Sequence, residues 1–346
     1  MSLASAIRTR DLNELPSRRD EDWRWSDLKA LIRVMPDPSP AVQTAAANPA
    51  LDGVDAARIL YINGRLVDGD RIAIPATGKG AFVRRFVSAT AQTAHHVDAP
   101  VEVGAGGRLL LIDSFEGQAA GYLASTTGAI RLGEGATVER IVLIDEQEDA
   151  VSVARFEVQL AEGASFSQTV LASGAKRQRF ETHVAHPGGA TLRLDGAYLL
   201  GGARHSDQTT VLNHEGLSGL SSQLVKGVVA DRARAVFQGK IIVAKGADGT
   251  DARMGSHAIL LSDRAEVDAK PELEIYADDV QCAHGNTVGA LDDAALFYAR
   301  SRGIPDLQAK AMLTAAFVGE VVERIGDEAA REMARAWVET KLAGLV

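Results

Sequence analysis

Cysteine is almost missing from this sequence, in which Cys282 is the one such residue among 346. A single cysteine cannot form a disulfide within the chain, which fits a reducing compartment. It also excludes a metal centre that is held only by cysteines of this chain. Any metal bound through Cys282 must therefore find its other ligands among different residue types or on a second chain.

Long apolar runs and an excess of basic residues are missing as well. No stretch reaches the roughly 18 uncharged apolar residues of a membrane helix. The N-terminal MSLASAIRTRDLNELPSRRDEDWRW carries charges every few positions, unlike a secretion signal. With 37 Lys and Arg against 46 Asp and Glu, the net charge of −9 disfavours nucleic acid and anionic membranes as main partners. We expect a globular, cytoplasmic protein.

The sequence also lacks the common nucleotide-binding and hydrolase motifs. GAGGRLL, at 104–110, does not have the G-x-G-x-x-G spacing, and TGKGAF, at 77–82, lacks the Gly-Lys-Ser/Thr ending of a P-loop. No G-x-S-x-G stretch occurs. We therefore expect no ATPase activity from this chain and no catalytic residues of these types.

What the chain does contain is a loose repeat of short, alternating apolar segments, such as LGEGATVERIVLI and LAEGASFSQTVLA. Gly-Ala pairs begin at 135, 163 and 189 and Arg-Ala pairs at 234 and 264, so several intervals are 26 to 30 residues long. No long helical period interrupts the pattern. It predicts a mainly β fold in which coils stack as a parallel β-helix, with a large jelly roll as the alternative.

Helical patterns flank this repeat. Leu and Trp residues spaced among charges over 10–32 predict short amphipathic helices, and the Pro- and Ala-rich stretch 34–53 predicts a linker. In RILYINGRLVDGD, two apolar runs flank Asn63 and Gly64, which predicts a two-residue hairpin turn.

After residue 289 the pattern becomes helical again. Leu313, Phe317, Val321 and Ile325 follow one another at a spacing of four, as on one face of a helix. We expect three regions: an N-terminal helical region with linker and hairpin (1–100), a β-helix core (101–289) and a C-terminal helical domain (290–346).

The strongest chemical candidate lies in PELEIYADDVQCAHGNTVG, at 271–289. In a strand, Cys282 and His284 project from the same face, so a thiol and an imidazole could bind one metal ion or one sulfur species. The alternative is a buried thiol beside a turn histidine, with no chemical role. The spacing of these two residues alone favours the buried thiol.

A longer stretch of sequence favours a chemical role for Cys282 and His284, because it resembles a known family. KPELEIYADDVQCAHGNTVGALDDAALFYARSRGI at 270–304, together with VFQGKIIV and LLSDRAEVDAKP upstream, closely resembles the SufB and SufD family of iron-sulfur cluster assembly scaffolds. LPSRRDEDWRWSDL near the start matches more weakly. The short chain with one thiol is more similar to the SufD branch than to the longer SufB branch, which has extra cysteines. The resemblance implies a right-handed β-helix core with helical ends.

The resemblance also implies partners and a site. It implies a heterodimer with SufB through the β-helix cores and a SufC ATPase docked on the C-terminal helices, where Phe317 and Val321 are the candidate contacts. Cys282 and His284 match the family's cysteine and histidine near the heterodimer interface, and the histidine is implicated in forming the nascent iron-sulfur cluster. We therefore expect these two residues to bind cluster iron together with SufB, and no stable cluster on this chain alone.

One departure and several alternatives accompany the resemblance. Gln238 and the stretch 251–262 stand where the family often has Asn, so no function is carried over to them. A SufB-like paralogue, a purely structural partner with inert Cys282 and His284, and a homodimer of the isolated chain all stay open. A different class, a polysaccharide-acting β-helix enzyme, would have a secretion signal and aromatic platforms, but only 5% of residues are aromatic.

Overall fold

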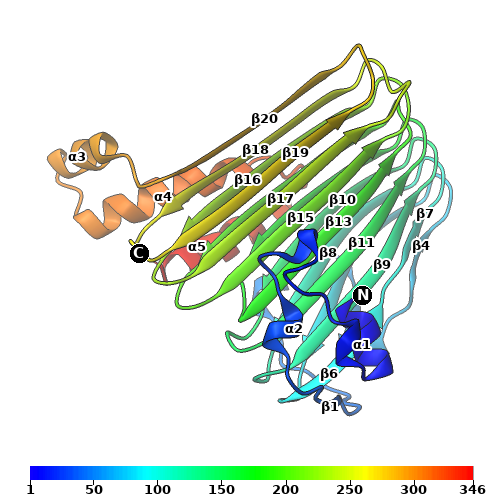
Figure 1. Cartoon of the computed structure of the whole chain (residues 1–346), viewed down its shortest axis with the longest axis horizontal. Helices are drawn as coiled ribbons and strands as arrows, with labels where there is room; N and C mark the ends of the chain where they lie inside the picture. Colours follow the sequence, from blue (N-terminus) through cyan, green and yellow to red (C-terminus); the bar gives the residue numbers. More distant parts are fainter. Residues whose placement is uncertain (346) are drawn as a thin grey trace.

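The computed structural model describes residues 1–345, and its centre is a parallel β-solenoid with helices on two sides (Figure 1). The chain passes back and forth between two ten-stranded sheets that form the walls of the solenoid. The first sheet contains β1 (Asp37–Pro38), β4 (Ile72–Ile74), β6 (Thr93–Asp98), β7 (Val101–Val103), β9 (Leu123–Leu132), β11 (Val151–Leu160), β13 (Arg177–His186), β15 (His205–His214), β17 (Arg234–Val243) and β19 (Glu266–Ile275). The second contains β2 (Ala57–Ile62), β3 (Arg65–Asp68), β5 (Lys79–Ser88), β8 (Arg108–Gly117), β10 (Thr137–Asp145), β12 (Ser165–Ala172), β14 (Thr191–Leu200), β16 (Leu220–Val229), β18 (Asp251–Leu260) and β20 (Gln281–Gly289).

The coils stack in parallel register, as the repeat predicts. Val151 on β11 lies opposite Arg177 on β13, a step of 26 residues. His205 on β15 lies opposite Arg234 on β17, a step of 29 residues. The predicted mainly β fold of stacked coils is therefore confirmed, and no jelly roll is formed.

Glycines form one row of corners, where the chain crosses from the first sheet to the second. Gly135 and Gly163 have φ angles of 62° and 68°, in the left-handed region that other residues enter at a cost of about 1 kcal/mol. The Gly135 N–H donates to the carbonyl of Glu162 at 3.0 Å, which links one corner to the next. The recurring Gly-Ala pairs are thus the corners of successive coils.

The parallel ladder begins earlier in the chain than the expected core. β2 pairs in parallel with β5, and β5 with β8, so the expected boundary at residue 101 falls inside the solenoid. The predicted hairpin is confirmed, because β2 and β3 are antiparallel around Asn63 and Gly64, whose φ angles are 49° and 78°.

Apolar side chains fill the space between the two sheets and form one continuous cluster. Neighbouring coils fit large side chains against small ones. Tyr198 on β14 lies opposite Gly227 on β16, where a Cβ atom would come within 1.7 Å of the tyrosine ring. Packing of this kind fixes the register between coils.

Three charged residues are buried among the apolar ones near the beginning of the solenoid. Arg84 donates to both carboxylate oxygens of Asp113, at 2.7 and 2.8 Å, and Arg140 donates to Oδ2 of the same residue. All three side chains are essentially inaccessible to water. Burial alone would raise the pKa of Asp113, but the two guanidinium groups hold it below the usual value.

The N-terminal segment lies across the outer face of the first sheet (Figure 1). It contains α1 (Leu3–Thr9), two short 3₁₀ turns (Leu12–Glu14 and Glu21–Trp23) and α2 (Leu28–Leu31). Ser26 donates a hydrogen bond to Asp207 on β15 at 2.5 Å, and Arg179 on β13 donates to the carbonyl of Asp22 at 2.7 Å. Polar contacts therefore fasten this segment to coils far along the chain.

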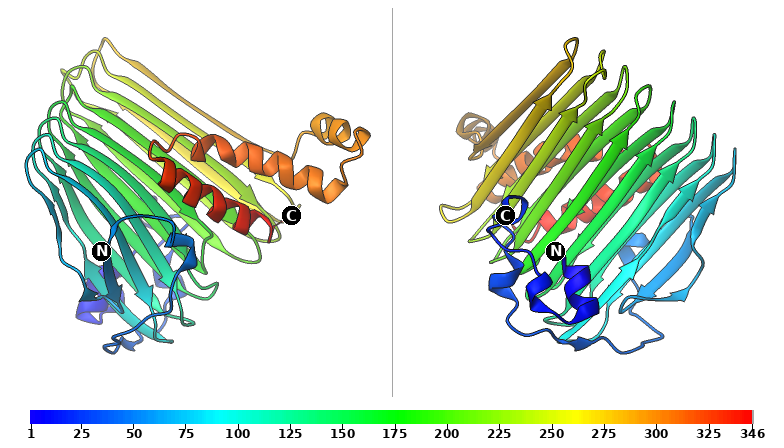
Figure 2. Two further views of the ribbon diagram at one scale, coloured as in Figure 1. Left: turned by 180° about the vertical axis from the view of Figure 1, so that it is seen from behind. Right: turned by 45° about the vertical axis from the view of Figure 1, so that its right-hand side comes forward.

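The C-terminal helices α4 (Asp306–Val322) and α5 (Glu328–Leu342) cover the outer face of the second sheet, where they form a shared apolar cluster with it (Figure 2). The carboxylate of Glu139 on β10 accepts from the N–H groups of Gly326 and Asp327, at 2.7 and 2.9 Å, and fixes the turn between the helices. Helix α3 (Asp293–Ser301) projects beyond the sheets and has no buried residue. Within residues 1–345, no helix has the length and apolar character to cross a membrane.

Candidate functional site

The last coil of the solenoid is exposed to solvent. β19 and β20 are the terminal strands of the two sheets, so each pairs with a single neighbouring strand within residues 1–345. Most residues of β20 are exposed and those of β19 are mostly partly buried, in contrast to the inner strands. The backbone N–H and C=O groups along the free edge of each strand are available for pairing with another chain.

The inside of this coil is apolar. Val267, Leu273 and Val280 are partly buried and pack against the core cluster of the solenoid. No further coil within the described residues covers them. We call this surface, with Cys282 and His284, the open end, because the apolar interior of the solenoid reaches solvent there.

The structure places Cys282 and His284 on one face of β20, as the sequence predicts. Cys282 lies opposite Ala252 and His284 opposite Met254, and both of these β18 residues are buried in the core. In a parallel ladder, opposed residues share a face, so Cys282 and His284 both project toward the interior side of the open end. Cys282 contacts the core and His284 is exposed.

The environment favours the imidazole over the thiol as a ligand. Partial burial, with a smaller contribution from Asp251, raises the pKa of Cys282, which keeps the thiol protonated. Metal binding requires the thiolate, so Cys282 must lose a proton first. His284 is exposed and can approach a ligand without leaving a packed position.

Two candidate ligands do not complete a metal site. Within the described part of the chain, no group of three or more His, Cys, Asp or Glu side chains is arranged to hold a metal ion. Asp278 and Asp279 precede β20, and their backbone N–H groups donate to the carboxylate of Asp248 at 3.2 and 3.4 Å. An iron site at the open end therefore needs ligands from elsewhere.

A second histidine near the end of the solenoid does not join this site. His257 is on β18, and its Nδ1 is 2.8 Å from the hydroxyl of Thr287 on β20. His257 is three residues from Met254, so its side chain is on the outer face, opposite to that of His284. It provides a control position of the same residue type.

Of the two residues expected to contact SufC, Val321 is fully buried and Phe317 is partly buried. Val321 belongs to the cluster between α4 and the second sheet, and Phe317 packs against that cluster with the Lys226 ammonium 4.4 Å from its ring centre. The spacing of four therefore marks the side of α4 that faces its own sheet. Val321 offers no surface to a partner in this structure.

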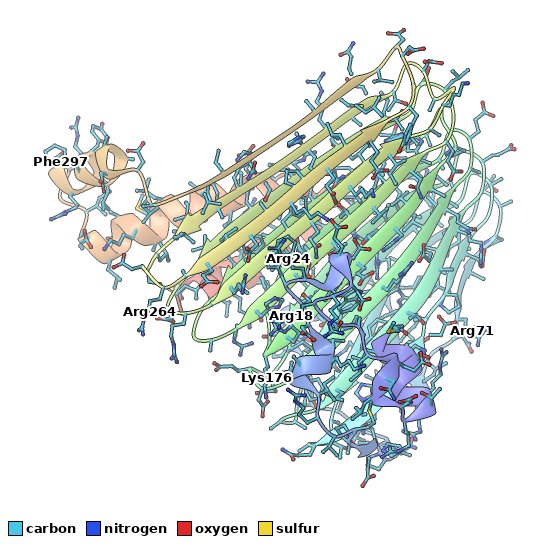
Figure 3. The ribbon with its side chains drawn as sticks, viewed as in Figure 1. Arg18, Arg24, Arg71, Lys176, Arg264 and Phe297 are labelled. Carbon is cyan, nitrogen blue, oxygen red and sulfur yellow. The ribbon has the colours of Figure 1, made fainter. Side chains whose placement is uncertain are left out.

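The exposed apolar surface of this region is instead on α3 and the beginning of α4, which sequence analysis did not identify. Phe297 and Leu307 have 74% and 64% of their surface exposed, and Tyr298 and Met312 are exposed as well. Phe297 projects from the far end of the molecule (Figure 3). The adjacent aromatic residues Phe297 and Tyr298 could have indicated this exposed surface, because a short helix with charged neighbours cannot bury both side chains.

Comparison with known proteins identifies the family of this chain. The family model described as "SUF system FeS cluster assembly, SufBD core domain" matches residues 86–317, which include most of the solenoid, the open end and α3. The chain belongs to the SufBD family. Its role is therefore in the SUF system of iron-sulfur cluster assembly.

Curated SufBD relatives match the chain over different lengths. The iron-sulfur cluster assembly protein SufD of Escherichia coli is 30% identical, over 95% of this chain and 90% of that protein. A SufBD family protein of Mycobacterium bovis is 26% identical over 96% of this chain and 90% of its own length. One from Synechocystis is 33% identical over 59% of this chain and 45% of its own length. The chain is thus similar to SufD from end to end.

Proposed function

We propose that this chain is a SufD-type scaffold subunit without catalytic activity. It pairs with SufB through the open end, binds the SufC ATPase through α3 and the start of α4, and helps to build a nascent iron-sulfur cluster that is later passed on. The observation that carries the proposal is the open end itself. SufBD membership argues against a polysaccharide-acting enzyme, whereas a SufB-like paralogue and a purely structural partner are the alternatives that the experiments below test.

The open end needs a partner for two physical reasons. β19 and β20 present unpaired backbone groups, and the apolar side chains beside them lose the burial that each inner coil receives from the next one. A second solenoid with its own exposed coil would satisfy both needs at once. Pairing of this kind is a form of strand addition between chains.

The proposed cluster site is shared between the chains. His284 supplies one nitrogen, and Cys282, once deprotonated, supplies one sulfur, so the remaining ligands come from SufB. A cluster held by few ligands from each chain is easier to release than one held by four cysteines of a single chain. The cluster is the cargo of the complex and not a resident cofactor.

Substitution of His284 tests this site. His284→Ala is expected to leave folding and SufB binding nearly unchanged and to lower the iron content of the anaerobically reconstituted complex at least twofold, because alanine cannot supply the nitrogen. Cys282→Ser is expected to have a smaller effect, since SufB brings thiols of its own. Iron content, sulfide content and melting temperature are measured on the same preparations.

The matched control is His257→Ala, on the outer face of the same sheet. It removes an imidazole near β20 without touching the proposed site, so iron loading should stay at the wild-type level. Normal iron loading in a folded His284→Ala complex would contradict the ligand role. Loss of folding in the same variant would instead support the purely structural alternative.

The SufC contact is tested by comparing exposed and buried apolar residues of the same helices. Phe297→Asp and Leu307→Asp are expected to weaken SufC binding at least tenfold while leaving the melting temperature unchanged, because both side chains are exposed. Val321→Asp should unfold the helical region, since it buries an unpaired charge. Unchanged SufC affinity in the exposed variants, measured by titration calorimetry, would place the contact on another face.

A further inference from the structure

The charge of the solenoid changes sign at its last coil. Residues 263–279 contain seven Asp and Glu but only two basic residues, Arg264 and Lys270. The coil before it, residues 231–253, contains three acidic and five basic residues. Residues 263–279 therefore have a net charge of −5, next to a coil with a net charge of +2.

We call the acidic residues of this last coil the acidic rim: Asp263, Glu266, Asp268, Glu272, Glu274, Asp278 and Asp279. Basic residues of the same chain neutralise only some of them. Asp268 and Glu274 on β19 pair with Arg234 and Lys240 of the neighbouring strand β17, at 2.7 and 2.6 Å. Both of these bases are on β17, on the side of β19 opposite to its free edge, and Lys270 on β19 itself pairs with Glu272 at 3.1 Å. Asp263, Asp278 and Asp279 are exposed and take part in none of the ion pairs formed within residues 1–345.

The apolar part of the open end cannot by itself select a partner. Val267 and Leu273 would pack against any apolar solenoid end, including that of a second copy of this chain. Specificity requires a feature that fits one partner and opposes another. The acidic rim is such a feature, because it follows β19 and the loops on either side of it, beside the apolar side chains of the open end, although β20 itself has no acidic residue.

We propose that the acidic rim determines which solenoid end this chain accepts: it favours a partner whose rim is basic and opposes self-pairing. The inference rests on the proposed pairing through the open end. Two copies would bring two acidic rims together, and like charges on adjacent strands destabilise a sheet. A basic rim on the partner would neutralise the same carboxylates and speed the encounter at low salt.

A charge-reversed chain tests this selectivity without any other protein. The rim-reversed variant carries Asp263→Lys, Glu266→Lys, Asp278→Lys and Asp279→Lys, residues chosen because they form no ion pair or, for Glu266, only a long one of 3.5 Å. A 1:1 mixture with wild type, in about 50 mM salt, should form a mixed pair at least tenfold tighter than wild type pairs with itself. Sedimentation velocity with one chain labelled measures both affinities.

The matched control carries the same change in total charge away from the open end. Asp55→Lys, Glu134→Lys, Asp149→Lys and Glu162→Lys replace exposed carboxylates on other coils and loops. A mixture of this control with wild type should pair no better than wild type alone. A neutral variant with Asn or Gln at the four rim positions should self-associate more than wild type. This variant tests the same inference if the charge-reversed variant fails to fold.

Salt dependence gives an independent reading. At about 1 M salt, where charges interact over only about 3 Å, the advantage of the mixed pair should shrink at least fivefold. Wild type that pairs with itself as tightly as with the reversed chain would overturn the proposal. A mixed pair that is equally stable at both salt concentrations would do the same.

Binding to SufB separates this inference from the proposed function. The rim-reversed variant should bind SufB at least tenfold more weakly than the control variant does. If SufB binds both variants equally well, the rim proposal fails while the pairing stands. If SufB binds neither the control nor wild type, the proposed pairing fails, and the mixed-pair measurement still decides the role of the rim.

Discussion

The two ends of the solenoid are built from the same coil but differ in what covers them. At the first end, the edges consist of β3 of the hairpin, with four residues, and of β1 and β4, with two and three. At the last end, β19 and β20 are full-length strands with free edges. Short edge strands discourage pairing with other chains, and long ones invite it. The comparison teaches that a repeat protein can direct association to one end by closing the other.

The largest expected effect concerns the buried charges near the first end of the solenoid, which we call the closed end because only short strands form its edges. Asp113→Ala leaves the guanidinium groups of Arg84 and Arg140 without their shared carboxylate. An unpaired buried charge costs about 3–5 kcal/mol, so we expect a loss of unfolding free energy of this size in urea denaturation.

An exposed ion pair provides the control. Glu102→Ala removes the partner of Arg131, and about half of each side chain is exposed. The expected loss is below about 1 kcal/mol. Similar losses in the two variants would show that the buried group does not stabilise the closed end.

A pH effect of intermediate size is expected from His95, beneath the hairpin. Burial, with a smaller contribution from Arg65, lowers the pKa of His95 from 6.5 to about 4. The folded state therefore binds the proton more weakly than the unfolded state. The stabilising contribution is complete above pH 6.5 and is lost as the pH falls toward 4, by at most about 3 kcal/mol.

Replacing His95 with a residue that does not titrate isolates this contribution. Unfolding free energy measured between pH 7 and pH 4 should fall less steeply for His95→Gln than for wild type. An unchanged slope in His95→Gln would assign the pH dependence to other groups.

The smallest expected effect compares one glycine at each end. Gly64, in the hairpin, has a φ of 78°, and a Cβ atom there would lie 2.6 Å from the carbonyl oxygen of His96. Gly64→Ala should therefore cost about 1–3 kcal/mol. Gly285, on β20, has no atom within 4 Å of such a Cβ, and Gly285→Ala should change stability by less than about 0.5 kcal/mol. Equal melting temperatures for the two variants would remove this contrast between the ends.

Local features of the fold could be predicted from the sequence because each depends on a few neighbouring residues. The corners at Gly135 and Gly163 follow from the backbone freedom of glycine, and the hairpin follows from Asn63 and Gly64. The placement of Cys282 and His284 on one face follows from strand alternation. The role proposed for that face comes from the family resemblance and not from the alternation.

Features that depend on how coils and helices stack could not be predicted in the same way. The apolar spacing on α4 does not say which of its faces meets the sheet, so Val321 was expected at a partner surface and is instead buried. The meeting of Arg84, Asp113 and Arg140 requires the register of three successive coils. The open end depends on which strands lie at the edges of the sheets, since β19 and β20 each pair with only one strand within residues 1–345.

The N-terminal segment has a consequence for the time course of synthesis. Glu21 forms an ion pair with Lys270 on β19 at 2.9 Å, so a segment that is synthesised before the solenoid contacts one of the last strands of the solenoid. At about 5–20 residues per second, the segment waits on the order of 10 to 50 s for that partner. Coils can therefore stack one after another as they emerge, and the N-terminal segment can pack early against β6, β9 and β11, whereas its contact with β19 forms only when the last coil has been made.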